Sequence, residues 1–210
     1  MTFLPLRAGE APGLVDYLDR LLGLDKRAAV RLQASGLVLG VWSGPPFEAV
    51  ALRPVALAEP MTFDQTVSAQ RLRDRLTDWV SDGGLVELPA TVPGPSWVGL
   101  LPPKSGWEER ARGSVGYVRD AVGTAKHFFR QRAEGVTDRS RLDAIAADVW
   151  ERACLGEVPV RAGHAAEALG LLGPAGGEAV AYACDNWQRL AAPGGSVAVR
   201  RDVLPGLFVF

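Results

Sequence analysis

The sequence predicts an α+β protein. An N-terminal antiparallel sheet with helices on one face is followed by a mainly helical C-terminal part that ends in a β-hairpin. Three observations support this fold class. Two apolar, β-rich runs are joined by the short, turn-like link at residues 44–46. Apolar residues recur at helical spacing after residue 114. A segment rich in proline, glycine and charge lies between, and it predicts two domains at residues 1–103 and 114–210.

The N-terminal elements follow from hydrophobic spacing and turn residues. Leu14, Leu18 and Leu21 recur at helical spacing, and Asp25 is expected to begin a second short helix. Ser68 is a favourable cap for a helix with an apolar side and a charged side. In chain order we predict helices within 10–34, an antiparallel pair of strands at 37–43 and 47–58, a helix at 68–80, and short strands at 85–88 and 97–101.

The C-terminal part is expected to contain four helices before its hairpin. Val115, Val118 and Val122 lie on one helical stripe, and Thr137 or Asp138 can cap the next helix. After the boundary loop at 102–113, the predicted elements are helices at 115–135, 138–150, 161–172 and 178–190, and strands at 196–201 and 207–210.

The composition indicates a packed globular protein. The chain has 210 residues, of which 48% are hydrophobic and 22% charged, which is typical of proteins with a sizeable core. A net charge of −1 provides no overall attraction to nucleic acid or to an anionic membrane. Only three of the basic residues are lysines, and this preference for arginine is typical of a GC-rich genome.

The compartment predicted from the sequence is the cytoplasm. No apolar run approaches about 18 residues, and the first residues lack the pattern of a signal peptide. The two cysteines do not form the framework of a disulfide-rich secreted protein. We therefore expect no membrane partner.

The order of helices followed by a hairpin resembles a winged helix. The segment 164–171 resembles the second helix and turn of helix-turn-helix proteins, in which a glycine opens the turn. The following helix would expose Glu178 and Asp185, which repel a phosphate backbone. Arg200 and Arg201 on the wing would then have to contribute to DNA binding. The alternative is an ordinary helical subdomain closed by a hairpin.

A basic stretch lies between residues 104 and 141, which hold nine Lys or Arg residues against five Asp or Glu residues. Arg119, Lys126 and Arg130 are seven and four positions apart, so they are predicted to share one helical face. Such a face is suited to a phosphate backbone or to an acidic partner. A solvated helix surface explains the same pattern.

Motifs for catalysis, cofactors and metals are missing from the sequence. His127, Cys154, His164 and Cys184 are the available histidines and cysteines, and their spacing fits no metal site. The cysteines are interpreted as small core residues. No phosphate-binding glycine loop and no serine nucleophile motif occurs. We expect no cofactor and no metal, and we assign no catalytic residue.

One segment has the composition of a ligand pocket. Trp97 and Trp107 flank a proline-rich loop that carries Lys104, and aromatic walls with a few polar groups are typical of small-molecule sites. Tryptophans packed beneath an interdomain connection explain the same residues.

The leading hypothesis is a non-catalytic cytoplasmic binding or regulatory protein that contacts DNA. The residues expected to bind nucleic acid are Arg119, Lys126, Arg130, Arg200 and Arg201. One alternative is a protein-interaction scaffold that uses exposed apolar positions such as Trp107. The other is a small-molecule enzyme with an interdomain pocket formed by Trp97, Lys104 and Trp107.

Overall fold

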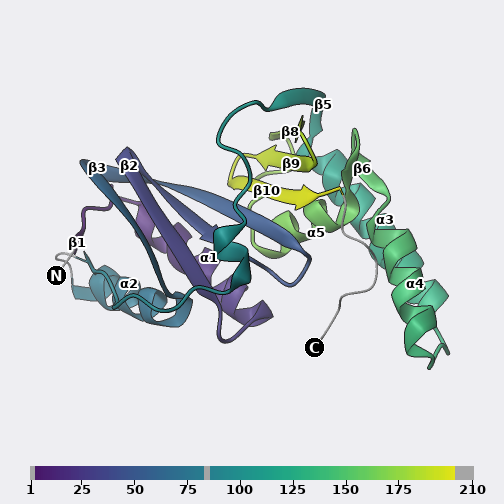
Figure 1. Cartoon of the computed structure of the whole chain (residues 1–210), viewed down its shortest axis with the longest axis horizontal. Coiled ribbons are helices and arrows are strands. Elements are labelled where there is room, and N and C mark those ends of the chain that lie inside the picture. Colours follow the sequence, from purple (N-terminus) through teal and green to yellow (C-terminus); the bar gives the residue numbers. More distant parts are fainter. Residues whose placement is uncertain (1–2, 83–85, 202–210) are drawn as a thin grey trace. The chain divides into compact units, whose positions relative to one another are not determined.

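The computed structural model describes residues 3–82 and 86–201, and it has the α+β fold predicted from the sequence (Figure 1). The chain divides into two compact units. The first comprises Met1–Leu101 with Ala168–Leu171, and the second comprises Pro102–Glu167 with Leu172–Phe210.

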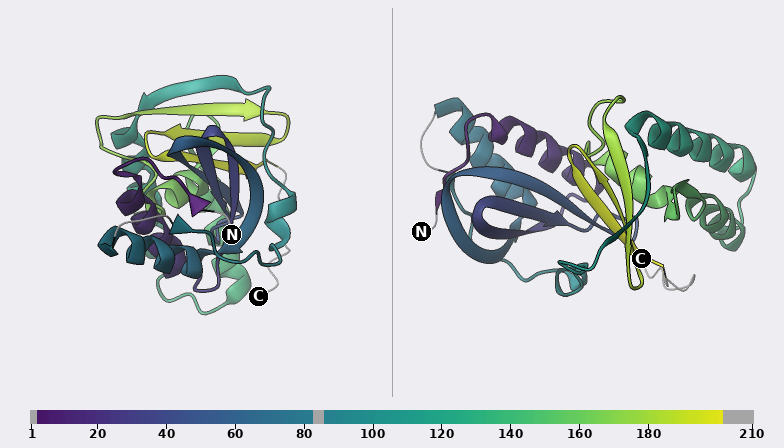
Figure 2. Two further views of the ribbon diagram at one scale, coloured as in Figure 1. Left: turned by 90° about the vertical axis from the view of Figure 1, so that its left-hand side faces the viewer. Right: turned by 90° about the horizontal axis from the view of Figure 1, so that it is seen from above.

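The first unit is built on a long antiparallel ribbon. Its elements are β1 (Phe3–Leu4), α1 (Glu10–Leu24), β2 (Ala29–Ser43), β3 (Ala49–Ser68), α2 (Ala69–Asp82), β4 (Val86–Glu87) and the 3-10 helix η1 (Ser96–Gly99). β2 pairs with β3 in antiparallel register, with a shift between Gly36 and Val38. Alternate β2 side chains from Val30 onward are buried, and α1 and α2 lie side by side over the ribbon (Figures 1 and 2). The predicted hairpin and the helix after Ser68 are confirmed.

Two predictions for the first unit are wrong. The short helix after Asp25 does not form, because Ala29 begins β2 and Ala29–Gly36 pairs along β3. Pairing satisfies every other backbone group of this segment and buries Val30 and Leu32, so the tertiary contact overrides the helical spacing. The strand expected at 97–101 is replaced by η1.

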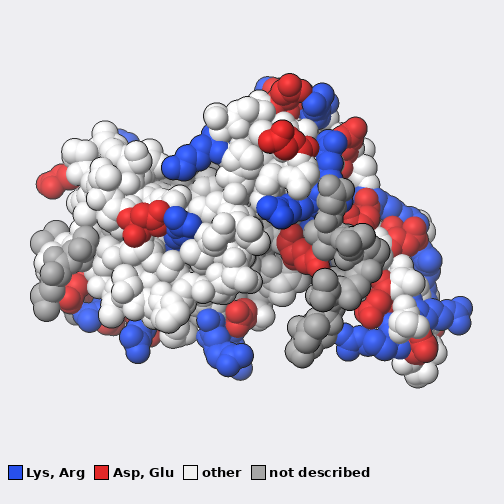
Figure 3. Space-filling model, viewed as in Figure 1, with Lys and Arg blue, Asp and Glu red and all other residues white. Residues whose placement is uncertain are grey.

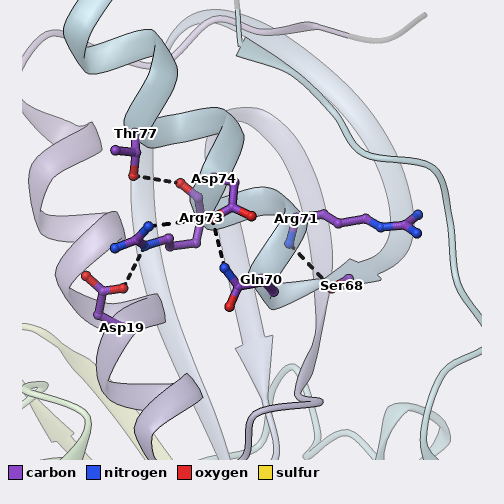
Figure 4. Close-up of polar contacts among 7 residues, drawn as sticks. All are labelled: Asp19, Ser68, Gln70, Arg71, Arg73, Asp74 and Thr77. Atoms are coloured by element: carbon purple, nitrogen blue, oxygen red, sulfur yellow. Dashed lines mark hydrogen bonds and ion pairs between the residues drawn. The ribbon is translucent and has the colours of Figure 1, made fainter.

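An ion pair joins the two helices of this unit (Figure 4). Arg73 Nε on α2 donates to Asp19 Oδ1 on α1 at 2.8 Å, and Thr77 Oγ1 donates to the Arg73 carbonyl at 3.0 Å. Arg71 points away from α1 in Figure 4, and only its backbone N–H is bonded there, to Ser68 Oγ at 3.4 Å. The solvent-exposed pair contributes little to stability, so the helices depend mainly on their apolar contacts.

The second unit places helices on one face of a four-stranded antiparallel sheet. Its elements are β5 (Glu108–Ser114), α3 (Val115–Ala133), α4 (Arg139–Trp150), β6 (Ala153–Leu155), β7 (Val158–Pro159), α5 (Val160–Ala168), β8 (Glu178–Cys184), β9 (Trp187–Ala192) and β10 (Gly195–Arg200). The strand order is β10-β9-β8-β5. The helices expected at 115–135 and 138–150 are confirmed, with Ser114 and Asp138 as their caps.

The sheet face beneath the helices is apolar. Val197 pairs with Leu190, Leu190 with Ala181, and Ala181 with Ala111, so these side chains form one row across four strands. The turn between β6 and β7 packs on this row: a Cβ at Gly156 would lie 2.8 Å from the Ala111 Cβ. Gly156 also has a φ of +55°, so this turn requires glycine for both reasons.

The largest error in the sequence prediction lies in this sheet. The helix expected at 178–190 is instead β8 and β9, joined by a tight turn in which Asp185 has a φ of +50°. The winged-helix outline is not confirmed, because the segment assigned to its recognition helix is β-structure. The strand expected at 196–201 is confirmed as β10, and it pairs with β9. Its predicted partner at 207–210 lies outside the described residues.

A buried hydrogen bond ties α1 to β2, and its removal is expected to destabilise the protein. The Tyr17 hydroxyl lies 2.7 Å from Ser43 Oγ, and Ser43 is 0% exposed. Tyr17→Phe leaves Ser43 without this partner and should lower the free energy of unfolding by about 1–2 kcal/mol. In urea denaturation, Tyr17→Phe/Ser43→Ala should recover part of the loss. An additive double variant would contradict the coupling.

The same tyrosine is expected to make stability depend on alkaline pH. Burial raises the pKa of Tyr17 from 10.0 to about 12, against the opposing effects of Ser43 and Arg53. Between those values the unfolded state releases a proton that the folded state keeps, so stability falls as pH rises by up to about 1.4 kcal/mol per pH unit. Urea denaturation of wild type and Tyr17→Phe from pH 9 to 12 should show this extra loss in the wild type only.

Candidate binding surfaces

Helix α3 positions three of the cations predicted to bind nucleic acid. Its buried stripe includes Val118, Val122 and Ala125, which fixes the rotation of the helix. Arg119, Lys126 and Arg130 are spaced by seven and four residues, so they lie together on a flank beside this stripe. We call these three residues the α3 flank.

Two members of the α3 flank already have partners. Arg119 Nη2 donates to the Gly173 carbonyl at 2.7 Å, and Lys126 Nζ pairs with Glu167 Oε2 at 2.5 Å. Arg130 is exposed and has no ion pair within the described part of the chain. The flank therefore offers one free guanidinium and two cations whose charge is shared with the protein.

The structure places Arg200, the last residue of β10, and Arg201, which follows it, on different sides of the sheet. Side chains alternate along β10, where Val197 and Val199 are buried on the helix side. Arg201 has the same parity and pairs with Glu157 Oε2 at 2.5 Å. Arg200 has the opposite parity, and its guanidinium lies 5.0 Å from the centre of the Trp187 ring. The five predicted residues thus lie on two sides of the sheet.

The residues of the predicted pocket have packing contacts within their own units. Trp97 in η1 packs over Gly44, since a Cβ at Gly44 would lie 2.5 Å from the Trp97 ring. In the second unit, Trp107 Nε1 donates to the Pro103 carbonyl at 2.8 Å, and Lys104 is exposed in the loop between them.

Arg189 lies in an arrangement that the sequence does not predict. Its guanidinium carbon lies 4.2 Å from the centre of the Trp107 ring and 4.9 Å from the centre of the Tyr182 ring. Burial lowers the pKa of Arg189, and the effects that oppose it come from Tyr182 and Cys184. The sequence predicts a helix at 178–190, and a helix would not bring Arg189 and Tyr182 together as the β8–β9 pairing does. The signal available in the sequence was the two-residue turn Asp185-Asn186 between apolar runs.

Charged side chains of both signs are mixed on the face shown in Figure 3. Around α3 and α4, Asp148 Oδ2 pairs with both Arg132 and Arg152, and Arg139 lies 3.6 Å from Asp143. Such pairing leaves no broad single-sign field there. Nucleic-acid binding would depend on a few specific cations.

The thiols have little nucleophilic character at neutral pH. Burial raises the pKa of Cys154 to about 11, and Cys154 Sγ donates to the Pro159 carbonyl at 3.6 Å. The pKa of Cys184 is also raised, by burial first and then by Asp185. Both groups are therefore thiols rather than thiolates at neutral pH.

Among the described residues, no three His, Cys, Asp or Glu side chains gather in a way that suits a metal ion. In the same part of the chain, no helix is both long and apolar enough to span a membrane.

Two family models match successive parts of the sequence. Residues 1–99 match a domain of unknown function (DUF8010), and residues 102–204 match another domain of unknown function (DUF8185). No curated protein matches the chain.

Several solved structures share the fold. A DNA polymerase sliding clamp from Pseudomonas aeruginosa superposes with a TM-score of 0.54 and 14% identity over 95% of this chain and 64% of that chain. A DNA polymerase sliding clamp from Caulobacter crescentus gives a TM-score of 0.56 and 11% identity over 91% of this chain and 64% of that chain. The C. crescentus pol III beta gives a TM-score of 0.55 and 12% identity over 95% of this chain and 66% of that chain. This chain therefore has a sliding-clamp-like fold and spans less than two thirds of the length of these proteins.

The pKa of His164 depends on the Lys126–Glu167 pair. It stacks on Trp150 with ring centres 5.0 Å apart, and its pKa is lowered from 6.5 by burial and then by Lys126, while Glu167 opposes the shift. The unfolded state therefore binds more protons below pH 6.5, and stability should fall as pH drops through that range. In a His127→Gln background, NMR titration should show the His164 pKa rising when Lys126 is replaced by methionine. An unchanged value would contradict the electrostatic contact.

Proposed function

We propose that this chain is a non-catalytic cytoplasmic protein that associates with DNA through the α3 flank. The observation that carries the proposal is the sliding-clamp-like fold, since the matched structures are described as DNA polymerase sliding clamps. An exposed cation on a helix supports it, because Arg130 can contact phosphate without losing an internal partner.

The proposed contact is to the phosphate backbone. Arg130 makes the main phosphate contact. Arg119 adds positive charge while its Nη2 donates to the Gly173 carbonyl. Lys126 contributes only when phosphate competes with Glu167 for its ammonium group. Few cations are involved and the net charge is −1, so binding is expected to be weak, strongly salt-dependent and indifferent to sequence.

A protein-interaction role is the second candidate, and a specific observation favours it. Arg189 and Arg200 both rest on aromatic rings and lack a carboxylate partner in the described part of the chain. Tryptophan, tyrosine and arginine are the residues most enriched at the energetic centres of protein interfaces. This surface is distinct from the α3 flank.

Removal of the α3 flank charges is expected to weaken DNA binding. In Arg119→Gln/Lys126→Ala/Arg130→Ala, affinity for a random duplex at low salt should fall, and the slope of log K against log salt should decrease by up to about 3. Arg130→Ala alone should account for most of the loss. Fluorescence anisotropy with labelled duplex and single strand at two salt concentrations measures both quantities.

The matched control is Lys26→Ala/Arg27→Ala/Arg71→Ala, which removes three exposed cations from the first unit. It should bind DNA as the wild type does. Circular dichroism checks that the flank variants remain folded, since Arg119 and Lys126 also have internal contacts. Absence of wild-type binding at low salt, or equal losses in the flank variant and the control, would reject the proposal.

A further inference from the structure

Two arginines on the sheet face opposite the helices have unsatisfied hydrogen-bond donors. Arg189 on β9 lies between Trp107 and Tyr182, and Arg200 on β10 lies over Trp187. The Nε atom of each is inaccessible to solvent and has no acceptor. Within the described part of the chain, no hydrogen bond or ion pair holds either guanidinium. We call this surface the arginine–aromatic face.

The strand register places the two guanidinium groups next to each other. Ala198 pairs with Arg189, and Trp187 pairs with Arg200, so the two arginines are diagonal neighbours on adjacent strands. Diagonal neighbours are separated by roughly 7–8 Å. Both side chains are partly exposed, and therefore their outer N–H groups are within reach of a partner.

Two nearby arginines of the same unit differ from Arg189 and Arg200 in having carboxylate partners. Arg161 is 7% exposed, lies 2.6 Å from Glu151 Oε1 and donates to the Arg200 carbonyl. Arg201 pairs with Glu157. Asp185, in the β8–β9 turn, lies 4.0 Å from the Cys184 sulfur, and in the described part of the chain it forms no ion pair with either stacked arginine. The Nε atoms of Arg189 and Arg200 are inaccessible, so an external acceptor can bind only the outer Nη groups, which have no acceptor in the described part of the chain.

The geometry selects carboxylates on an extended chain. In an extended peptide, residues i and i+2 project to the same side about 6.8 Å apart, which matches the diagonal spacing of the arginines. Each guanidinium offers a planar fork that suits a carboxylate. Lys104 adds an exposed cation in the loop that carries Trp107. The aromatic rings already hold guanidinium groups, which leaves less ring surface for stacking nucleic-acid bases.

We propose that the arginine–aromatic face binds an extended acidic segment of a partner protein, with two carboxylates spaced i and i+2 on Arg189 and Arg200. This inference deepens the second candidate function and does not depend on DNA binding. Apolar side chains beside the carboxylates would contact the exposed rims of Trp107 and Tyr182. The aromatic stacks hold both arginines in place before binding, which lowers the entropy lost on association.

The test uses a fluorescein-labelled decapeptide with a central Glu-Leu-Glu flanked by leucine and phenylalanine, and the same peptide with Gln-Leu-Gln. Anisotropy should show binding of the glutamate peptide to wild type and at least tenfold weaker binding of the glutamine peptide. Arg189→Gln and Arg200→Gln should each weaken binding about tenfold, and the double variant should abolish it. The matched control Arg71→Gln/Arg141→Gln should bind as wild type does.

The outcomes separate this proposal from others. Equal binding of both peptides, no binding of the glutamate peptide, or full binding by the Arg189→Gln/Arg200→Gln variant would overturn it. Tighter binding of a labelled single-stranded oligonucleotide that is lost in the same variant would also overturn it, in favour of a phosphate ligand. If the double variant does not fold, the comparison of the two peptides on wild type decides. The α3 flank variant should retain peptide binding whether or not the DNA proposal holds.

Discussion

Alternation of side chains across the strands β8, β9 and β10 is the constraint on which the second unit depends. One parity supplies Ala181, Leu190 and Val197, which are 0% exposed beneath the helices. The other parity must then face away from the helices, and it carries Arg189 and Arg200. Because the register is fixed by burial of the apolar row, the position of the arginines follows from core packing.

The same logic governs the α3 flank. Burial of Val118, Val122 and Ala125 sets the rotation of the helix, and the flank cations are placed at the border of the packed stripe. At such a border, long basic side chains reach neighbouring groups, as Lys126 reaches Glu167. A basic helical face read from spacing alone therefore overstates the charge available to a ligand. Arg130, at the outer part of the flank, is exposed and forms no ion pair in the described part of the chain.

The sequence was informative where local signals were strong. The helices at 115–133 and 139–150 have clear apolar stripes and capping side chains, and both were predicted. An alanine-rich apolar run such as 178–190 fits a helix as well as a buried strand, so the sequence predicts a helix where the structure has β8 and β9. Contacts such as Arg189 with Trp107 join residues far apart in the sequence. They depend on strand pairing, so a local sequence pattern does not predict them.

The aromatic stacks at Arg189 and Arg200 also determine how the arginine–aromatic face can bind a ligand. An aromatic ring stabilises a guanidinium through its face but accepts none of its in-plane N–H bonds. Stacking therefore orients the donors without satisfying them. A carboxylate arriving in the guanidinium plane gains charge-assisted hydrogen bonds at little cost in side-chain ordering. The combination of a rigid support and open donors favours recognition of acidic groups over a purely structural role, since Arg161 and Arg201 of the same unit pair with carboxylates of the protein itself.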